Sequence, residues 1–239
     1  LHTNEREIAA TAEFDAQVEE RSADGWAMGT KLFQTETELL IRGQQPVSAL
    51  RSRATDTPTL RKAYFGDLHV HTANSFDAFT VGTLATPYDA YRYAKGEAIS
   101  HPAGFDMQMS RPLDFYAVTD HAMFLGVVKA AADTTTEFSK NEIAKSLHDL
   151  NAPENMGAGL FDLIKRLISF AAFLPDTVGQ ITTGQLDRNQ VLDVVRSTWS
   201  DTIDAADQFY DPGNFTTFAG YEYTSSTAGS GNLHRNVIF

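Results

Sequence analysis

Two histidines separated by one residue, His69 and His71, follow a short β-prone segment. Side chains alternate between the two faces of a strand, so Asp67, His69 and His71 are expected on one face. Leu68 and Val70 would then pack on the opposite, buried face. Both imidazoles can reach one divalent ion from this spacing, with Asp67 behind them as an acceptor that fixes a tautomer. An isolated His-x-His pattern is equally compatible with the polar face of an edge strand.

Further histidines and carboxylates stand at the ends of other predicted strands. Asp120 and His121 end a second β-prone run, Glu222 ends a third, and His234 begins a fourth. In parallel α/β folds, catalytic groups collect at the carboxyl ends of the strands, so these residues are expected to meet. Asp120 can also cap a helix with His121 in its first turn, and the two roles are compatible.

The charge and composition of the chain exclude several classes of function. The 239 residues include 19 basic and 31 acidic residues, a formal net charge of −12, and no cysteine. The negative charge repels polyanions, so a small substrate is favoured and nucleic acid is not expected as a partner. The lack of cysteine excludes disulfides, zinc ribbons and thiol catalysis.

The most apolar run, residues 160–174, is interrupted by Asp162, Lys165 and Arg166, so no membrane span is expected. The chain is therefore predicted to be soluble. The sequence leaves open whether it is cytoplasmic or periplasmic.

The domain organisation follows from the positions of these patterns. Residues 1–62 are predicted to form an N-terminal extension and linker, and residues 63–239 the domain that carries the chemistry. A helix from Pro87 to about Lys95 is expected to connect the first two strands, because proline is favoured at the first helical position. The segment between the second and third strands is much longer than a crossover needs, which predicts a helical insertion at about residues 124–212.

Three helices are expected within this insertion, from the spacing of apolar residues: 141–150, 160–173 and 189–209. Pro175 and the polar segment after it are expected to end the second helix. This second helix is unusually apolar, and the preferred interpretation is that it lies in the core or faces another subunit of a homo-oligomer. The alternative is a lid that shields the site or binds an apolar part of the substrate.

Six residues form the inventory of candidate metal ligands, four histidines and two carboxylates: His69, His71, Asp77, His121, Glu222 and His234. These are too many for one four-coordinate zinc ion, and carboxylates bridge cations well, so a cluster of two or more ions is expected. Such a cluster activates water and stabilises a leaving group, which suits hydrolysis of an anionic ester. Mixed nitrogen and oxygen ligands suit manganese, iron and zinc alike.

The motifs occur in a characteristic order: Asp-Leu-His-Val-His-Thr, Ser-Phe-Asp-Ala, Thr-Asp-His, Gly-Tyr-Glu-Tyr and Asn-Leu-His-Arg-Asn. This order resembles the PHP superfamily, named for polymerase and histidinol phosphatase, and within it a large bacterial branch known only as a domain of unknown function. The resemblance runs from Tyr64 to Phe239, with a long unmatched middle. It implies an α/β fold, a distorted β/α barrel similar to a TIM barrel, interrupted by the helical insertion. It also implies two or three divalent ions (Mn, Zn or Fe) held by the six candidate ligands, with Glu222 as the bridging carboxylate.

Two further residues are candidates for a catalytic role. Asp120 is expected to orient a ligand or relay a proton, and Arg235 to bind a substrate oxyanion through its forked donors, although a surface salt bridge suits Arg235 equally. Members of the superfamily take more ligands from later strands, and this sequence ends at Phe239 before such a motif. The resemblance therefore implies an incomplete barrel, completed by a remaining C-terminal part of the same catalytic unit.

The leading hypothesis is a metal-dependent hydrolase that acts on a small anionic substrate, with a phosphoester as the bond that is cut. A carboxylic ester, an amide or a sulfate ester needs the same activated water, so these bonds stay open. A metal-stabilised binding or accessory domain without turnover is the alternative from another class.

Overall fold

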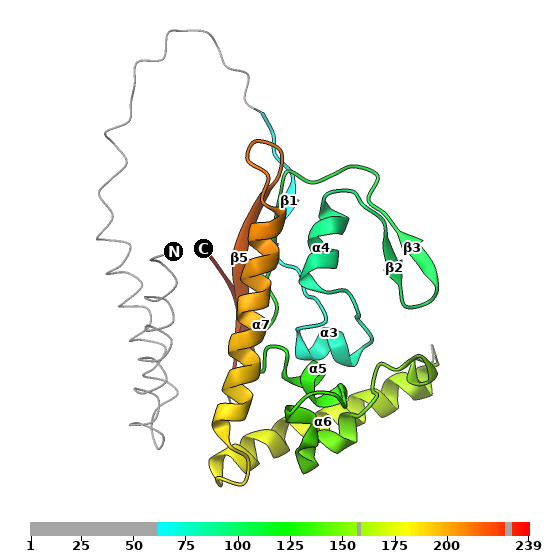
Figure 1. Ribbon diagram of the computed structural model, residues 1–239, viewed down its shortest axis with the longest axis vertical. Coiled ribbons are helices and arrows are strands. Elements are labelled where there is room, and N and C mark those ends of the chain that lie inside the picture. Colours follow the sequence, from blue (N-terminus) through cyan, green and yellow to red (C-terminus); the bar gives the residue numbers. More distant parts are fainter. Residues whose placement is uncertain (1–61, 157–158, 228–230) are drawn as a thin grey trace, which may run out of the picture. The chain divides into compact units, whose positions relative to one another are not determined.

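The structure contains a four-stranded sheet in the order β1-β4-β5-β6. Two of its strands, β1 and β5, are labelled in Figure 1. The computed structural model describes residues 62–156, 159–227 and 231–239. The predicted N-terminal extension, residues 1–62, lies outside the described residues except for Lys62. Residues 62–239 form one compact unit of mixed α/β structure.

Three strands of the sheet are parallel and the fourth is not. β1 (Gly66–Asp67) pairs in parallel with β4 (Phe115–Val118), which pairs in parallel with β5 (Thr216–Thr227). β6 (Gly231–Ile238) pairs antiparallel with β5. The second, third and fourth predicted strands are therefore present, and the hairpin β5-β6 gives the sheet one antiparallel edge. Glu222 was expected to end the third strand and His234 to begin the fourth. Both lie within their strands instead, because the pairing of the hairpin continues to Thr227 and Gly231.

The first predicted strand differs from expectation, because β1 is only two residues long and is exposed instead of buried. Gly66 permits the close pairing with β4, since a Cβ at this position would lie 2.2 Å from the carbonyl oxygen of Phe115. Beyond it, the Asp67 carboxylate accepts a hydrogen bond from the backbone N–H of His69 at 3.0 Å. This local bond competes with the strand ladder, so the backbone leaves the sheet before the histidines.

The predicted helix at Pro87 is confirmed as α4 (Pro87–Ala94), which connects β1 to β4. Thr86 and Asp89 form a capping box at its start, and the proline occupies the first turn. Tyr91 of α4 is fully buried against the sheet and α7. A small antiparallel hairpin follows, formed by β2 (Ile99–His101) and β3 (Phe105–Met107).

The chain between β4 and β5 is helical, in this order: α5 (Val127–Ala132), η2 (Phe138–Lys140), η3 (Glu142–Leu147), η4 (Pro153–Asn155), α6 (Leu160–Thr182) and α7 (Arg188–Phe209). The predicted helix at 141–150 is a 3₁₀ helix, and α7 matches the prediction within one residue. α7 lies along β5, whereas α6 crosses the end of the unit opposite β1 (Figure 1). One core forms between α4, α7 and the sheet, and another between α3 (Phe76–Thr80), α5 and α6.

Pro175 does not end the second predicted helix, because α6 continues to Thr182. A proline inside a helix removes one backbone hydrogen bond. On either side of Pro175, Phe173 and Thr177 are buried in the core, and the Thr177 hydroxyl donates to the Phe173 carbonyl at 2.7 Å. Packing of this turn therefore maintains the helix through the proline.

The apolar helix α6 is divided between core and surface. Phe173 is buried and Phe170 packs against the core, whereas Ile164, Leu167 and Ile168 are exposed. Part of the helix thus fits the preferred interpretation of a core helix. Among the helices of the described residues, none combines the length and apolar character that a membrane-spanning segment needs.

Candidate metal centre

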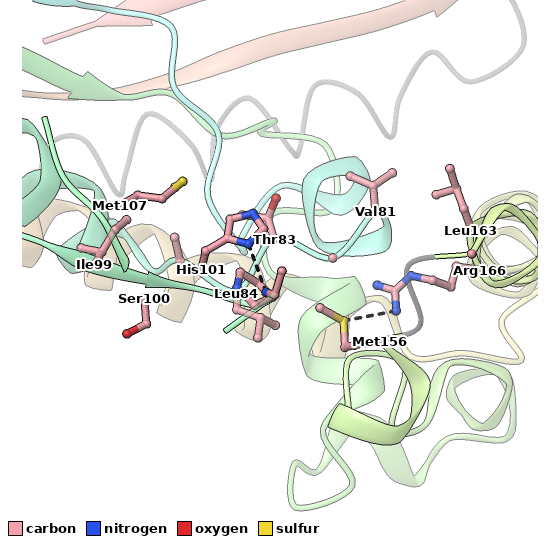
Figure 2. Close-up of a pocket in the computed structure, with 15 residues that line it drawn as sticks. Val81, Thr83, Leu84, Ile99, Ser100, His101, Met107, Met156, Leu163 and Arg166 are labelled. Carbon is pink, nitrogen blue, oxygen red and sulfur yellow. Dashed lines mark hydrogen bonds between the residues drawn. The ribbon is translucent and has the colours of Figure 1, made fainter. Parts of the chain in front are cut away.

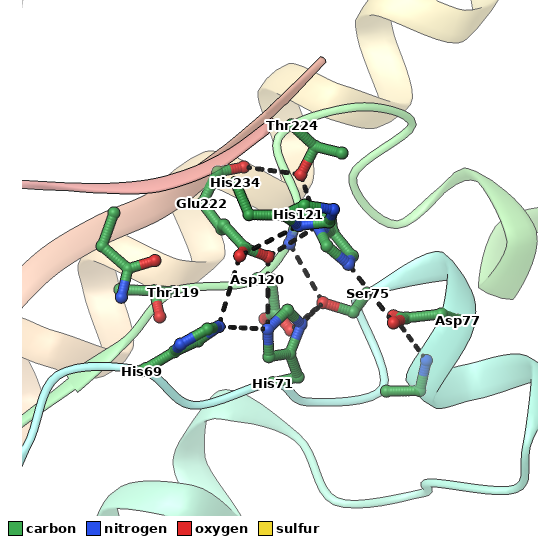
Figure 3. A network of polar contacts seen from close by, with 12 residues as sticks. His69, His71, Ser75, Asp77, Thr119, Asp120, His121, Glu222, Thr224 and His234 are labelled. Atoms are coloured by element: carbon green, nitrogen blue, oxygen red, sulfur yellow. Dashed lines mark hydrogen bonds and ion pairs between the residues drawn. The ribbon is translucent and has the colours of Figure 1, made fainter. Parts of the chain in front are cut away.

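Four segments bring the candidate ligands to one edge of the sheet (Figure 3). His69 and His71 lie on the extended segment after β1, and His121 follows the carboxyl end of β4. Glu222 lies on β5, where it forms an isolated parallel bridge with His121. His234 lies on β6, opposite Thr224 in the antiparallel register. Strand register therefore positions three of these segments against one another.

Glu222 lies at the centre of the cluster, with both carboxylate oxygens facing imidazoles. Its Oε1 is 3.3 Å from His69 Nε2 and 3.1 Å from His234 Nδ1. Its Oε2 is 3.4 Å from His71 Nε2 and 2.7 Å from His121 Nδ1. The Glu222 side chain is 2% exposed, whereas that of His69 is 56% exposed. The cluster is therefore buried at Glu222 and open to solvent at His69.

Asp77 extends the cluster along the first turn of α3. Its Oδ2 lies 3.2 Å from His121 Nε2, and its side chain is half-exposed. The potential ligand atoms fall into three groups, in each of which they lie within 4.8 Å of one another: His69, His71 and Glu222; His71, Asp77 and His121; His121, Glu222 and His234. All six predicted ligands thus belong to one connected cluster.

The electrostatics differ between the two inner histidines. Burial, with the neighbouring His121, lowers the pKa of His71 below the ordinary histidine value. Burial also acts to lower the pKa of His121, but its hydrogen bond to Asp77 and the surrounding carboxylates outweigh burial and raise that pKa. Burial disfavours ionisation of Asp77, yet its bonds with His121 and the Ala78 N–H outweigh burial and lower its pKa.

Asp120 lies behind the histidines and is 1% exposed. Its Oδ1 accepts hydrogen bonds from the Thr72 N–H at 2.5 Å and the Ser75 hydroxyl at 2.8 Å, and its Oδ2 accepts one from the Thr72 hydroxyl at 2.6 Å. Burial raises the pKa of Asp120 despite these donors. Asp120 thus holds the segment that carries His71, and its contacts with that segment run through Thr72 and Ser75.

The donor set fits a cation. Glu222 Oε2 is buried and has no hydrogen-bond donor within the described chain. Among the described residues, no lysine or arginine forms an ion pair with Asp77 or Glu222. Imidazole nitrogens and carboxylate oxygens that converge on one region are ligands that suit Mn, Fe or Zn.

Two predicted roles do not match the geometry. Arg235 follows His234 on β6 and pairs with Tyr223, so alternation directs it to the face opposite Glu222. The structure does not bring Arg235 into the cluster. Asp67 bonds to the backbone N–H of His69, and no hydrogen bond to an imidazole is seen for it among the described residues.

Two hydroxyl groups of the site were not identified from the sequence. Ser75 Oγ is 2.7 Å from His71 Nδ1, and Thr224 Oγ1 is 2.6 Å from His121 Nδ1. Ser75 stands four residues after His71, and Thr224 two residues after Glu222 on the same strand face. Thr224 could have been identified from the sequence, because its two-residue spacing from Glu222 places both on one face of the strand. Ser75 could not, because the turn after β1 brings it beside His71.

A cavity of about 920 Å³ lies apart from the cluster, between the α3-α4 loop, the β2-β3 hairpin and α6 (Figure 2). Leu84, His101 and Arg166 contribute to its wall, and none of the six candidate ligands does. Arg166 donates to the carbonyl oxygens of Thr80 at 2.8 Å and Leu150 at 2.7 Å. The Arg166 guanidinium therefore connects α6 to the segments that contain Thr80 and Leu150.

The comparisons with known proteins identify a family without a known activity. A family model described as "Protein of unknown function (DUF3604)" matches residues 58–239. No curated protein and no solved structure matches the chain. The match spans all six candidate ligands.

Proposed function

The chain belongs to the DUF3604 family of unknown function, and we propose that it is a metal-dependent hydrolase. Its substrate would be a small anionic molecule, with a phosphoester as the bond that is hydrolysed. The observation that carries the proposal is the buried Glu222 carboxylate, which faces four imidazoles and has one oxygen without a hydrogen-bond donor.

The six ligands of the cluster would hold two or three divalent ions (Mn, Zn or Fe), and their donor atoms form three overlapping groups of neighbours. When bound, such ions lower the pKa of water and stabilise charge on a leaving group. Glu222 would contribute one oxygen to the His69 side and the other to the His71 side. Because Glu222 is buried, solvent water does not compete for its carboxylate oxygens.

The open side of the cluster indicates where a substrate would enter. The side chains of His69, Asp77 and His234 are 56%, 51% and 38% exposed, whereas His121 is 5% exposed. Asp77, Asp120 and Glu222 make the region negative when the imidazoles are neutral. An anionic substrate would be repelled by these carboxylates, so its binding would depend on bound cations.

We also propose that the fold is a PHP-type barrel. The parallel strands β1, β4 and β5, with helical connections between them, support this proposal. The order of the five sequence motifs supports it as well. The antiparallel β6 differs from an all-parallel barrel.

The test uses the full-length protein, purified without added chelator. Its metal content is measured by mass spectrometry, and turnover is measured with phosphomonoesters, phosphodiesters, carboxylic esters and sulfate esters, with and without Mn, Zn or Fe. We expect bound metal and metal-stimulated hydrolysis of a phosphoester. Absence of both would overturn the proposal, and hydrolysis of a carboxylic or sulfate ester instead would reject the phosphoester assignment.

A pair of histidine variants separates catalysis from a structural ion. His71→Ala removes a ligand, and His101→Ala serves as the control because His101 stacks on Phe105 in the β2-β3 hairpin. If the ion is catalytic, we expect His71→Ala to lose turnover and to keep most of its stability. A large loss of stability in His71→Ala, with no turnover in the parent protein, would instead identify a non-catalytic metal-stabilised domain.

A further inference from the structure

The hydroxyl group of Ser75 makes three polar contacts at the base of the cluster. Its Oγ is 2.8 Å from Asp120 Oδ1, 3.0 Å from the backbone N of His121 and 2.7 Å from His71 Nδ1. Ser75 is fully buried, and Asp120 is nearly so. Water therefore does not compete for these contacts, and their donors and acceptors must match.

A hydroxyl group has one proton to donate and two lone pairs to accept with. The His121 N–H is a donor, so it uses one lone pair of Ser75 Oγ. The Asp120 carboxylate also accepts from the Thr72 N–H and hydroxyl, so it acts as an acceptor and takes the Ser75 proton. The remaining lone pair of Ser75 Oγ then accepts from His71 Nδ1.

We propose that Ser75, held by Asp120, is a positioning residue that fixes His71 as the Nδ1–H tautomer. The opposite nitrogen, His71 Nε2, then carries a lone pair. That atom lies 3.4 Å from Glu222 Oε2 and 3.1 Å from His69 Nε2, so the lone pair is directed into the cluster. The tautomer is a property of the metal-free protein. Its effect on metal binding rests on the proposed metal-dependent function.

The direction of the hydrogen bonds gives Asp120→Ala a specific consequence. Alanine offers no acceptor to the Ser75 hydroxyl, so the Ser75 proton is free for another partner. Ser75 would then donate its proton to His71 Nδ1, and the imidazole proton would move to Nε2. The lone pair that faces the cluster would be lost.

The first experiment measures the tautomer directly in metal-free full-length protein. Long-range ¹H–¹⁵N NMR spectra distinguish a protonated Nδ1 from a protonated Nε2, and a His71→Gln spectrum assigns the ring. We expect Nδ1–H in the parent protein, Nε2–H in Asp120→Ala and a mixture in Ser75→Ala. Ser139→Ala is the matched control, because Ser139 is also buried and its hydroxyl donates to the Thr136 carbonyl, outside the cluster.

The second experiment titrates Mn and Zn into the same variants by calorimetry. Loss of a residue that orients a metal-ligating histidine typically lowers metal affinity by about 10- to 100-fold, which we expect for Ser75→Ala and Asp120→Ala. We expect no change in Ser139→Ala. If Ser75→Ala fails to fold, Asp120→Ala still provides both measurements.

The outcomes separate this inference from the proposed function. A parent protein with His71 protonated at Nε2, or an unchanged tautomer in Asp120→Ala, overturns the positioning role even where metal binds. An Nδ1–H tautomer that switches as expected in a protein that binds no metal supports the hydrogen-bond assignment and overturns the metal-dependent function. Unchanged metal affinity in a variant whose tautomer has switched overturns the link between the two.

Discussion

His121 and Glu222 lie opposite each other across a parallel β-bridge, and Glu222 Oε2 is 2.7 Å from His121 Nδ1. The same nitrogen is 2.6 Å from Thr224 Oγ1, and Glu222 Oε2 accepts no hydrogen bond within the described chain. An unsatisfied buried polar group costs about 1–3 kcal/mol, and more when it is charged. The environment of Glu222 is therefore suited to a bound cation and unfavourable to the carboxylate alone.

Glu222→Gln tests this relationship. We expect it to abolish tight metal binding, because the neutral amide cannot bridge cations. In the presence of a chelator, its free energy of unfolding should equal or exceed that of the parent protein, since a buried charge has been removed. Metal at about 100 times its dissociation constant should stabilise the parent by about 2.7 kcal/mol and the variant by nothing.

Calorimetric titration and chemical denaturation with and without metal provide these measurements. Glu142→Gln is the matched control, because Glu142 is largely exposed and pairs with Lys145 three residues away. If Glu222→Gln binds metal as tightly as the parent protein does, the bridging role of Glu222 is contradicted.

Elements with local sequence signals were predicted well. The helix at Pro87 has a capping box and a proline in its first turn, and both signals act within a few residues. The position of His121 after β4 follows from a short, apolar, β-prone run that ends in a polar pair. The position of His121 at the carboxyl end of a parallel strand agrees with the general rule for catalytic groups in such sheets. Glu222 lies within β5 and not at its end, so its place beside His121 follows from the parallel register of β4 and β5.

Features that depend on contacts between distant residues were not predicted. The two-residue length of β1 depends on Gly66 against Phe115 and on the turn that Asp67 forms with His69. The continuation of α6 through Pro175 depends on core packing around it. Ser75 could not be recognised as part of the site, because its role requires Asp120, His121 and His71 to be adjacent in space.

The pair formed by Asp77 and His121 predicts a pH dependence of stability in the metal-free protein. The pKa of His121 is raised, so the pair stabilises the folded state below the ordinary histidine pKa of about 6.5 and this contribution is lost as the pH rises through the raised pKa. The pKa of Asp77 is lowered, so its contribution holds above the ordinary aspartate pKa of about 3.9 and is lost as the pH falls through the lowered pKa. Asp77→Asn should therefore destabilise the protein most between about pH 4 and about pH 6.5.

Urea denaturation in chelator at several pH values measures this difference, and an NMR titration should show a lower pKa for His121 in Asp77→Asn. The control is Asp193→Asn, since Asp193 is exposed and pairs with Arg196 on α7. A difference between parent and Asp77→Asn that grows above pH 7 would contradict the assigned pair.

Two neighbouring residues of β6 should behave differently on substitution. Asn236 donates from its side-chain amide to the Leu68 carbonyl at 2.7 Å, so it ties β6 to the segment just before His69. Asn236→Ala removes this hydrogen bond. It should therefore reduce the free energy of metal binding by roughly 1 kcal/mol, which is about a five-fold loss of affinity. Arg235→Ala should leave metal affinity unchanged, because Arg235 lies on the opposite face of the strand. Calorimetry on both variants checks this, and an equal loss in Arg235→Ala would restore a role for the arginine at the site.

Phe76 connects the cluster to the insertion through two stacked contacts. Its ring centroid is 4.6 Å from that of His121 and 5.4 Å from that of Phe170 on α6. An aromatic pair contributes about 0.5–1.5 kcal/mol beyond its buried area, so Phe76→Leu should lower the free energy of unfolding by roughly 1–3 kcal/mol. It should also weaken metal binding, because the His121 ring loses one wall of its pocket.

Phe170→Leu is the matched variant, since it removes the contact with Phe76 and leaves the contact between Phe76 and His121 in place. We expect it to lower stability by about 0.5–1.5 kcal/mol and to leave metal affinity unchanged. Denaturation and calorimetry on both single variants and the double variant measure each effect. If Phe170→Leu weakens metal binding as much as Phe76→Leu does, then α6 controls the geometry of His121, and the insertion acts on the site instead of only packing beside it.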